Sequence, residues 1–256
     1  MSQKDNKKKK TLRKWIINIL ILILLIVGLI LVFNVPVRNV LIGKGSNDYK
    51  VVNTSSSTLK KNKKAKVSYD MAAVEPVSFD KIVKSRIANG ISSKDNSDSK
   101  NLPIVAGIAI PDLGVNLPIF QGIGNTELTY GAGTMKEGEE PGKGNYALAS
   151  HHVTGMGPGL LFTPLEDAQI GQMIYISDNE KIYEYKITKT GVYDPNRVDL
   201  IEDNGDKATI TLVTCSDMQA THRIIVFGDF VKSYKTDDAS QDVKSAFETN
   251  YTAMYS

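Results

Sequence analysis

The sequence predicts an all-β extracytoplasmic domain tethered to a membrane by an N-terminal helix. Two observations carry this prediction: one uninterrupted apolar stretch near the N-terminus, and seven short β-branched runs separated by turn residues between residues 102 and 236. A composition of 41% hydrophobic and 23% charged residues is ordinary for a globular protein. The single cysteine closes one of the runs, so we first justify the elements and then this position.

The N-terminus reads as a basic tail followed by a membrane anchor. Residues 1–14 hold seven basic side chains against Asp5, and Trp15 to Phe33 is apolar except for Asn18 and Gly28. As a helix this run of 19 positions spans roughly 28 Å, close to the hydrocarbon thickness of a bilayer. A cleaved signal peptide is the alternative, but its apolar region is usually shorter and ends at small residues. We therefore expect a single-pass cell-membrane protein with residues 1–14 cytoplasmic and the chain from about residue 34 outside.

Residues 34–100 are expected to be an extracytoplasmic stalk with an N-terminal helical segment. The stretch 44–66 is rich in Lys, Ser, Asn and Thr, a composition that buries too little apolar surface to fold. Its lysines could contact anionic lipid or wall polymer. One short helix is predicted over Met71–Ile87, and 90–101 reads as a polar connector.

The domain itself, residues 101–236, is predicted to be a β-barrel or sandwich. Short helical turns are expected at Asn125–Tyr130 and Thr163–Gln169, and the strands alternate with turn residues rather than long helices. In the tail 237–256, Val243, Phe247 and Tyr251 have helical spacing and predict a short docked helix. The predicted strands are Ile104–Ile110, Val115–Phe120, Tyr146–Ser150, Met173–Ser177, Ile182–Thr190, Ala208–Cys215 and Arg223–Val231.

Charge and motifs exclude several classes of function. The net charge of +3 is concentrated in the tail, so the basic character does not indicate a nucleic-acid partner. No glycine-rich phosphate loop lies between a strand and a helix, and one cysteine with three histidines lacks zinc-ligand spacing.

Cys215 ends a predicted strand, where a side chain is held rigidly and can still meet a substrate. Alternation puts Thr211, Val213 and Cys215 on one face. If the next run pairs with this strand as an antiparallel hairpin, Arg223 lies across from Cys215. A guanidinium there would favour the thiolate or bind a developing oxyanion, although a surface arginine at a strand end fits the pattern equally well.

Cysteine nucleophiles also need a proton shuttle, and histidine is the usual residue near neutral pH. His151 and His152 close a predicted strand and point to opposite faces, so only one of them can share a cleft with Cys215. His222 adjoins Arg223 and is expected to face away. Periodicity alone leaves the choice between His151 and His152 open.

Thr211-Leu-Val-Thr-Cys215, with Arg223 eight residues on, resembles the TLxTC motif of sortases. Leu148-Ala-Ser-His151 is similar to their histidine motif, in which the first histidine is catalytic. The resemblance extends over roughly residues 100–235, through Gly107–Pro111, Gly144–Leu148 and Leu161–Leu165. With the N-terminal anchor, it is similar to class A, the housekeeping group of Gram-positive bacteria.

The resemblance implies a closed eight-stranded barrel and a membrane-anchored cysteine transpeptidase. Cys215 would attack the Thr–Gly bond of an LPxTG-like sorting signal and form a thioacyl-enzyme. His151 would act as general acid and base, and Arg223 would stabilise the substrate or the oxyanion. The implied partners are LPxTG-type surface proteins and an amine of a peptidoglycan precursor, lipid II; no cofactor is implied.

The family binds the sorting signal in an apolar groove beside the cysteine. The matching positions here are Ala149, Ser150, Val198, Leu200, Ile210 and Thr214, and for each apolar one the barrel core is the competing interpretation. Some relatives bind calcium nearby. Here Lys136 and Lys143 interleave with Glu137, Glu139 and Glu140, so we expect no metal site and no calcium dependence.

Two other functions fit the same residues less well. An extracytoplasmic cysteine peptidase would use the same Cys–His pair with water as acceptor. A non-enzymatic tethered binding barrel would keep Cys215 buried and inert.

Overall fold

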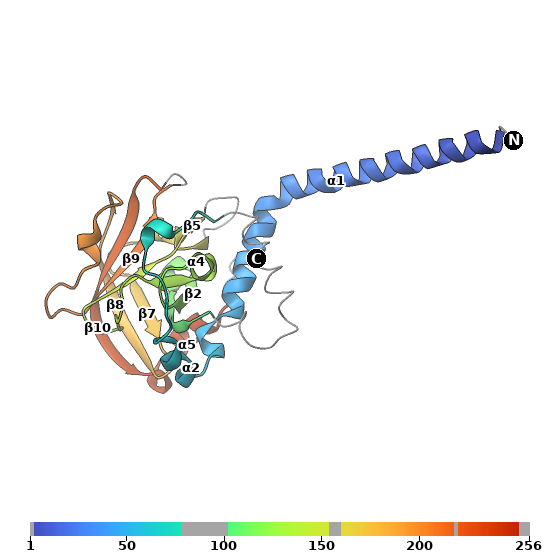
Figure 1. Cartoon of the computed structure of the whole chain (residues 1–256). Coiled ribbons are helices and arrows are strands. Elements are labelled where there is room, and N and C mark those ends of the chain that lie inside the picture. Colours follow the sequence, from blue (N-terminus) through green and yellow to red (C-terminus); the bar gives the residue numbers. More distant parts are fainter. Residues whose placement is uncertain (1–2, 78–101, 154–159, 218–219, 251–256) are drawn as a thin grey trace.

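The chain folds into a closed eight-stranded β-barrel carried on a long N-terminal helix (Figure 1). This computed structural model describes residues 3–77, 102–153, 160–217 and 220–250. Around the barrel the strands follow the order β1-β2-β3-β4-β9-β10-β8-β7, with β2–β3 and β4–β9 parallel and the other pairs antiparallel. The strands are β1 (Ile104–Ile110), β2 (Val115–Phe120), β3 (Ala132–Thr134), β4 (Asn145–Ala149), β7 (Met173–Ser177), β8 (Lys181–Tyr193), β9 (Thr209–Cys215) and β10 (Arg223–Lys235).

Alternating side chains fill the barrel. On β9, Ile210 and Leu212 point inward and are 0% exposed, whereas Val213 belongs to a second cluster on the outer face. That outer cluster includes Ala149 of β4 and Ile225 of β10. Both faces of this part of the sheet are therefore covered, which is why β9 reads as a nearly continuous apolar run.

All seven predicted strands are present, and the closed barrel with few short helices is confirmed. β3 was not predicted because three residues are too few to show a period, and the same holds for the separate two-stranded sheet of β5 (His152–Val153) and β6 (Leu160–Leu161). The short helical elements are α4 (Asn125–Tyr130), η4 (Pro111–Leu113), η5 (Thr163–Asp167), η6 (Val198–Ile201) and η7 (Thr236–Asp238).

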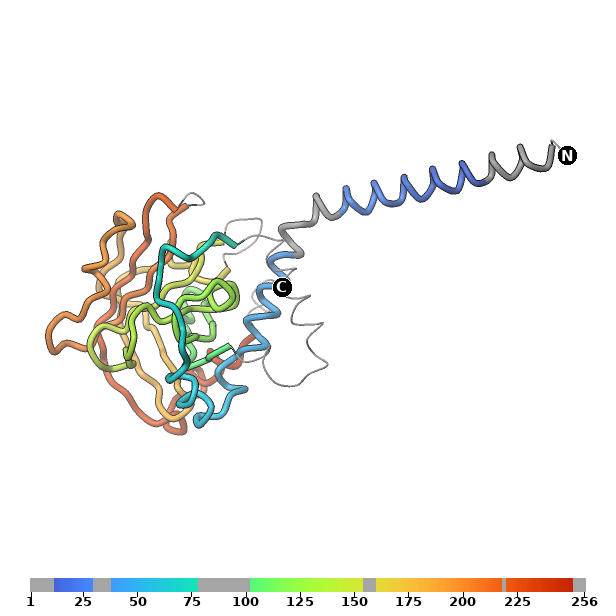
Figure 2. The backbone as a smooth tube through the Cα atoms, in the orientation of Figure 1, coloured from blue at the N-terminus to red at the C-terminus, as the bar shows by residue number. Residues whose placement is uncertain are grey.

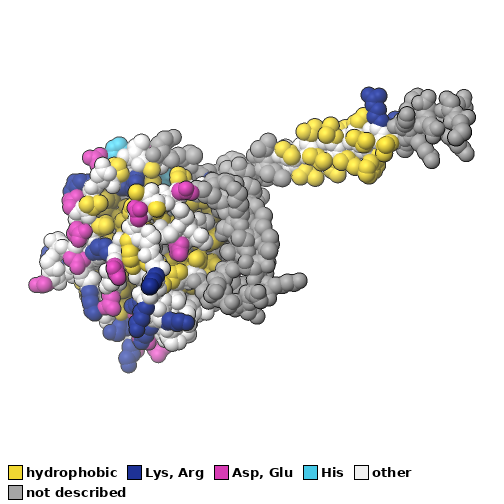
Figure 3. Space-filling view, viewed as in Figure 1, with side chains coloured by type: hydrophobic (Ala, Val, Ile, Leu, Met, Phe, Trp, Pro, Cys, Tyr) yellow, Lys and Arg dark blue, Asp and Glu magenta, His cyan; other side chains and the backbone are white. Residues whose placement is uncertain are grey.

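The helix α1 (Gln3–Asp48) has two parts with different surroundings. Its outer part contains a stretch, Leu12–Leu29, that is long and apolar enough to cross a membrane and is unburied. Figure 3 shows this part as a hydrophobic rod that projects from the barrel. Its last turns lie against the barrel, where Ile42 is 0% exposed and joins the main core.

The structure corrects the expected stalk at residues 44–66. After α1 come η1 (Val51–Asn53) and α2 (Ser56–Asn62), and both pack on the barrel through Val51 and Leu59, which are 3% and 1% exposed. The composition of a window averages over its residues, so it does not detect single apolar side chains that anchor an otherwise polar segment.

Residues 65–77, which we name the strap, run in an extended path along the barrel (Figure 2). Ser68 accepts a backbone hydrogen bond from Ile123, and Asn125 binds the backbone of Ala73 and Glu75. The predicted helix over Met71–Ile87 is replaced by one short turn, η2 (Met71–Ala73), within residues 71–77. Residues 78–87 and the connector 90–101 lie outside the described residues.

The two ends of the domain are joined beside β2. The predicted C-terminal helix is α5 (Gln241–Glu248), with Val243 and Phe247 buried; Tyr251 lies outside the described residues. Lys50, only 6% exposed, donates through Nζ to the carbonyl oxygens of Glu248 and Thr249 at 2.6 and 2.7 Å. It also donates to Oδ1 of Asn250 at 2.9 Å. Lys50 therefore caps the C-terminal end of α5.

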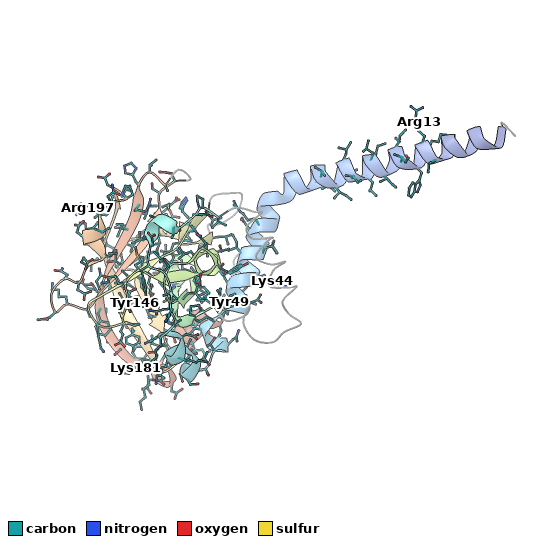
Figure 4. The ribbon with its side chains drawn as sticks, viewed as in Figure 1. Arg13, Lys44, Tyr49, Tyr146, Lys181 and Arg197 are labelled. Carbon is teal, nitrogen blue, oxygen red and sulfur yellow. The ribbon has the colours of Figure 1, made fainter. Side chains whose placement is uncertain are left out.

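Replacing Lys50 with methionine is expected to lower the free energy of unfolding by about 2–3 kcal/mol, because two carbonyl oxygens at the end of α5 would lose their charged donor. Urea unfolding of the detergent-solubilised chain measures this difference. Lys44→Met is the matched control, since Lys44 is exposed on α1 (Figure 4). Equal losses in both variants would contradict a capping role for Lys50.

Candidate active site

Three neighbouring strands bring His151, Cys215 and Arg223 into one row. Arg223 of β10 is paired directly with Cys215 of β9. On the other side, Ala149 of β4 is paired with Val213, and the amide of Ser150 continues this pairing to the carbonyl of Val213 at 3.1 Å. Two residues further, this register brings His151 level with Cys215. Paired residues project to the same face of a sheet, so the three side chains share one face.

This register favours His151 over His152 as the partner of Cys215. His151 is 8% exposed and lines a pocket together with Cys215 and Arg223. Its backbone is held by the hydrogen bond from Phe162 to its carbonyl oxygen at 3.1 Å. The Thr214 hydroxyl donates to the carbonyl of Ser150 at 2.9 Å, which ties the histidine segment to β9.

His152 also lines the pocket, but its Nε2 is engaged by the carboxylate of Glu166. His222 is half-exposed, and its Nε2 lies 3.9 Å from Oδ1 of Asp194. It does not line the pocket, in agreement with the prediction that it faces away. Neither histidine is in register with Cys215.

The thiol of Cys215 lies in a partly buried site of mixed charge. Burial raises the pKa of Cys215, the neighbouring guanidinium of Arg223 opposes this rise, and Asp217 adds to it. Burial is the largest of these effects, so the surroundings raise the pKa of Cys215 and favour its thiol form. A partner that accepts its proton is therefore needed to produce the nucleophile.

Arg223 is oriented by the loop that joins β9 to β10. Its Nη1 donates to the carbonyl oxygens of Ala220 and His222 at 2.8 and 3.1 Å. Ala220 has φ of 56°, a left-handed conformation that is rare for alanine. This conformation raises the energy of the backbone at Ala220, whose carbonyl oxygen is one of the two acceptors for Arg223.

The predicted groove residues have different positions. Ala149, Ser150 and Thr214 line the pocket, although the Ser150 hydroxyl is used in a 2.6 Å bond to the carbonyl of Gly131. Leu200 packs on the outer-face cluster, and Val198 is 68% exposed on η6. The prediction that Ile210 lines the groove is wrong. Its side chain points into the barrel and is 0% exposed, so it belongs to the core.

Sequence reasoning missed the contribution of the N-terminal segment to this pocket. Arg38 of α1 and the strap line it together with His151, Cys215 and Arg223. A weak signal was present, because Val67, Tyr69 and Met71 alternate with polar residues as in an extended chain. The additional lining residues are Met71, Val74, Glu75, Pro76, Val77 and Leu128.

Two of the three carboxylates considered for calcium, Glu139 and Glu140, are engaged by protein groups, as is the neighbouring Asp203. Both oxygens of Glu139 accept backbone hydrogen bonds, from Met135 and Ala147, each at 2.9 Å. Glu140 pairs with Lys143, and Asp203 pairs with Lys136. Within the described residues, no three His, Cys, Asp or Glu side chains form a group that could hold a metal ion.

Burial raises the pKa of Glu139 to about 8. The carboxyl is protonated in both states below about pH 4.5, and it ionises only in the unfolded chain between 4.5 and 8. Stability is therefore expected to fall as pH rises through this window, by at most about 1.4 kcal/mol per pH unit.

Denaturant unfolding at pH 5 and pH 8 in a Cys215→Ala background measures this fall in stability. Glu139→Gln should lose the dependence, whereas Glu140→Gln should retain it; an unchanged profile in Glu139→Gln would contradict the assignment.

Comparison with known proteins identifies the family of this chain. The family model described as "Sortase domain" matches residues 108–231. Sortase A of Streptococcus agalactiae is 44% identical over 239 residues, which cover 92% of this chain and 93% of that protein. The chain belongs to the sortase family. Sortase A of Listeria monocytogenes is 33% identical over 84% of this chain and 91% of that protein. The crystal structure of a Listeria monocytogenes sortase A covers 57% of this chain and 98% of its own, with 34% identity and a TM-score of 0.52.

Sortases are cysteine transpeptidases that attach surface proteins to the cell wall, and this sortase resembles the class A, housekeeping type. The membership implies proteins with a sorting signal as substrates and an amine of the cell wall as acceptor. The apolar part of α1 agrees with an enzyme that acts at the membrane.

Proposed function

We propose that Cys215, His151 and Arg223 form the catalytic set with which this sortase cleaves an LPxTG-like signal between Thr and Gly. The register of β4, β9 and β10 carries this proposal, because it aligns the three side chains on one face of one pocket. The acceptor in this proposal is an amine of the peptidoglycan precursor lipid II.

In the first half-reaction, the sulfur of Cys215 attacks the threonine carbonyl carbon. Because burial favours the thiol form of Cys215, its proton passes to His151 as the C–S bond forms. Arg223 stabilises the negative charge on the carbonyl oxygen. The C–N bond to glycine then breaks, and His151 gives the proton to the leaving amine. The product is a thioacyl-enzyme.

In the second half-reaction, His151 takes a proton from the incoming amine, whose nitrogen attacks the thioester carbonyl. A new amide bond forms, the C–S bond breaks, and His151 returns the proton to the sulfur of Cys215. The reaction exchanges one amide for another, so it needs no cofactor. A peptidase would complete the same cycle with water.

We further propose that the chain spans the membrane once, with residues 1–14 cytoplasmic. Basic residues before the apolar stretch favour this orientation. Both substrates reach the outer membrane surface, so a tether raises their effective concentration at the enzyme.

Product analysis separates a transpeptidase from a peptidase. The chain is incubated with an LPxTG peptide, with and without a glycine-based amine, and the products are identified by mass spectrometry. A Thr–amine ligation product supports the proposal. If the peptide is hydrolysed and added amine does not change the product, the result favours the peptidase. If no related signal peptide is cleaved at all, the result favours a binding barrel.

Arg223→Ala is expected to lower kcat/KM by about 10²–10³-fold, the usual loss when one oxyanion donor is removed. Arg223→Lys keeps the charge without the planar fork and should recover only part of the loss. Steady-state kinetics with a fluorogenic signal peptide measure both variants. Arg197→Ala is a suitable control, because Arg197 pairs with Asp199 on the surface; the same loss in this control would argue against a specific role.

A further inference from the structure

Arg38 links the membrane anchor to the catalytic pocket. It is the first charged residue after the apolar stretch that ends at Phe33. Its side chain is partly buried and lines the pocket that holds Cys215, His151 and Arg223. Residues of α1 thus reach from the membrane-spanning stretch directly to the site of chemistry.

The short spacing fixes the height of the pocket above the bilayer. Arg38 follows Phe33 by only five helical residues, which rise at most about 7.5 Å. The headgroup layer on each side of a bilayer is roughly 5–7 Å thick. With a span that ends at Phe33, as proposed above, Arg38 lies at the level of the lipid headgroups. Figure 4 shows Arg13 near the outer end of α1 and Lys44 where α1 lies beside the barrel.

The ionic group that a guanidinium meets at this depth is a lipid phosphate. Arginine binds phosphate with two parallel hydrogen bonds, and partial burial strengthens such contacts. Two carboxylates, Glu75 and Asp217, also line the pocket. The carboxylate of Asp217 is used by its own loop, since it accepts from the Ser216 hydroxyl at 2.9 Å and from the Thr221 amide at 3.1 Å. Arg223 is oriented toward the loop carbonyls. Arg38 donates through Nε to Oδ1 of Asn39 at 3.3 Å and, of the two pocket arginines, lies nearer in sequence to the apolar stretch.

We propose that Arg38 binds a lipid phosphate at the mouth of the catalytic pocket, and that this phosphate belongs to the carrier lipid of the acceptor amine. The inference rests on the proposed transpeptidation, to which it adds a docking point for the second substrate. A phosphate held at Arg38 fixes one end of the acceptor at the membrane surface, while its amine reaches the thioacyl group on Cys215. Phosphate recognition then contributes to acceptor choice, separately from recognition of the sorting signal.

The test uses the full chain in phosphatidylcholine vesicles with a soluble LPxTG donor. Three acceptors carry the same glycine-based amine: one soluble, one on a polyprenyl diphosphate, and one on an uncharged diacylglycerol. For each variant, the KM for each lipid acceptor is divided by the KM for the soluble amine. We expect Arg38→Ala to raise this ratio about tenfold for the diphosphate acceptor, the effect of losing one charged hydrogen-bond donor, and to leave it unchanged for the uncharged lipid. Arg38→Lys should raise it less.

Lys44→Ala is the matched control, because Lys44 is exposed on α1 six residues further from the membrane and does not line the pocket. An equal ratio in Arg38→Ala and the wild type would overturn the inference. A ratio that rises for both lipid acceptors, and follows added phosphatidylglycerol, would overturn the assignment to the acceptor and identify bulk phospholipid as the ligand. If the wild type forms no ligation product even with the soluble amine, the proposed function itself fails, which is a different result.

Discussion

Cys215→Ala is expected to abolish transfer, with kcat/KM for an LPxTG peptide reduced by more than about 10⁴-fold. The chain contains one cysteine, so no other thiol can take over the attack. The thioacyl intermediate should disappear with the activity, and intact-mass measurement of the enzyme mixed with signal peptide detects it directly.

The fold should survive this substitution. Cys215 lies at the end of β9 and is only partly buried, so removing its sulfur leaves the barrel core intact. Thermal unfolding of Cys215→Ala provides the control. Measurable thioacyl formation in the folded variant would show that Cys215 is not the nucleophile.

His151→Ala is expected to lower kcat/KM by about 10²–10⁴-fold, the range for losing a general acid and base. His152→Ala should cost less than tenfold, because its ring binds Glu166 and lies out of register with Cys215. Steady-state kinetics of the two variants under identical conditions show which of the two adjacent histidines acts as the general acid and base.

The pH profile adds a second readout for this pair. The acidic limb of kcat/KM should be lost in His151→Ala and kept in His152→Ala, since only the catalytic imidazole must change its charge during turnover. A larger loss in His152→Ala than in His151→Ala would reverse the assignment.

The alignment of His151, Cys215 and Arg223 could be predicted from the sequence only in part. Alternation predicted that Cys215 shares a face with Val213, and a hairpin brought Arg223 opposite it. The histidine required more, because β4 and β9 are parallel neighbours separated by 64 residues at the Ala149–Val213 pair. No local pattern encodes this register, so only the resemblance to sortases favoured His151.

The errors have a common physical origin. Ile210 was included in the groove, although it alternates with Thr211 and belongs to the barrel interior. The segment after the anchor was expected to be a stalk, yet Val51 and Leu59 bury themselves on the barrel. In both cases the surroundings of a side chain are set by residues distant in sequence, which a local window does not contain.

The cap that Lys50 places on α5 has a consequence for the timing of assembly. Lys50 is made early, but its acceptors lie 198 to 200 residues later. At typical synthesis rates they follow on the order of 10–40 s afterwards. During export the anchor is therefore in the membrane long before its neighbouring segment can complete its contacts. A chain truncated just before residue 248 would lack the acceptors for Lys50. The lost contacts would then affect the segment that follows the membrane anchor, at the opposite end of the sequence from the truncation.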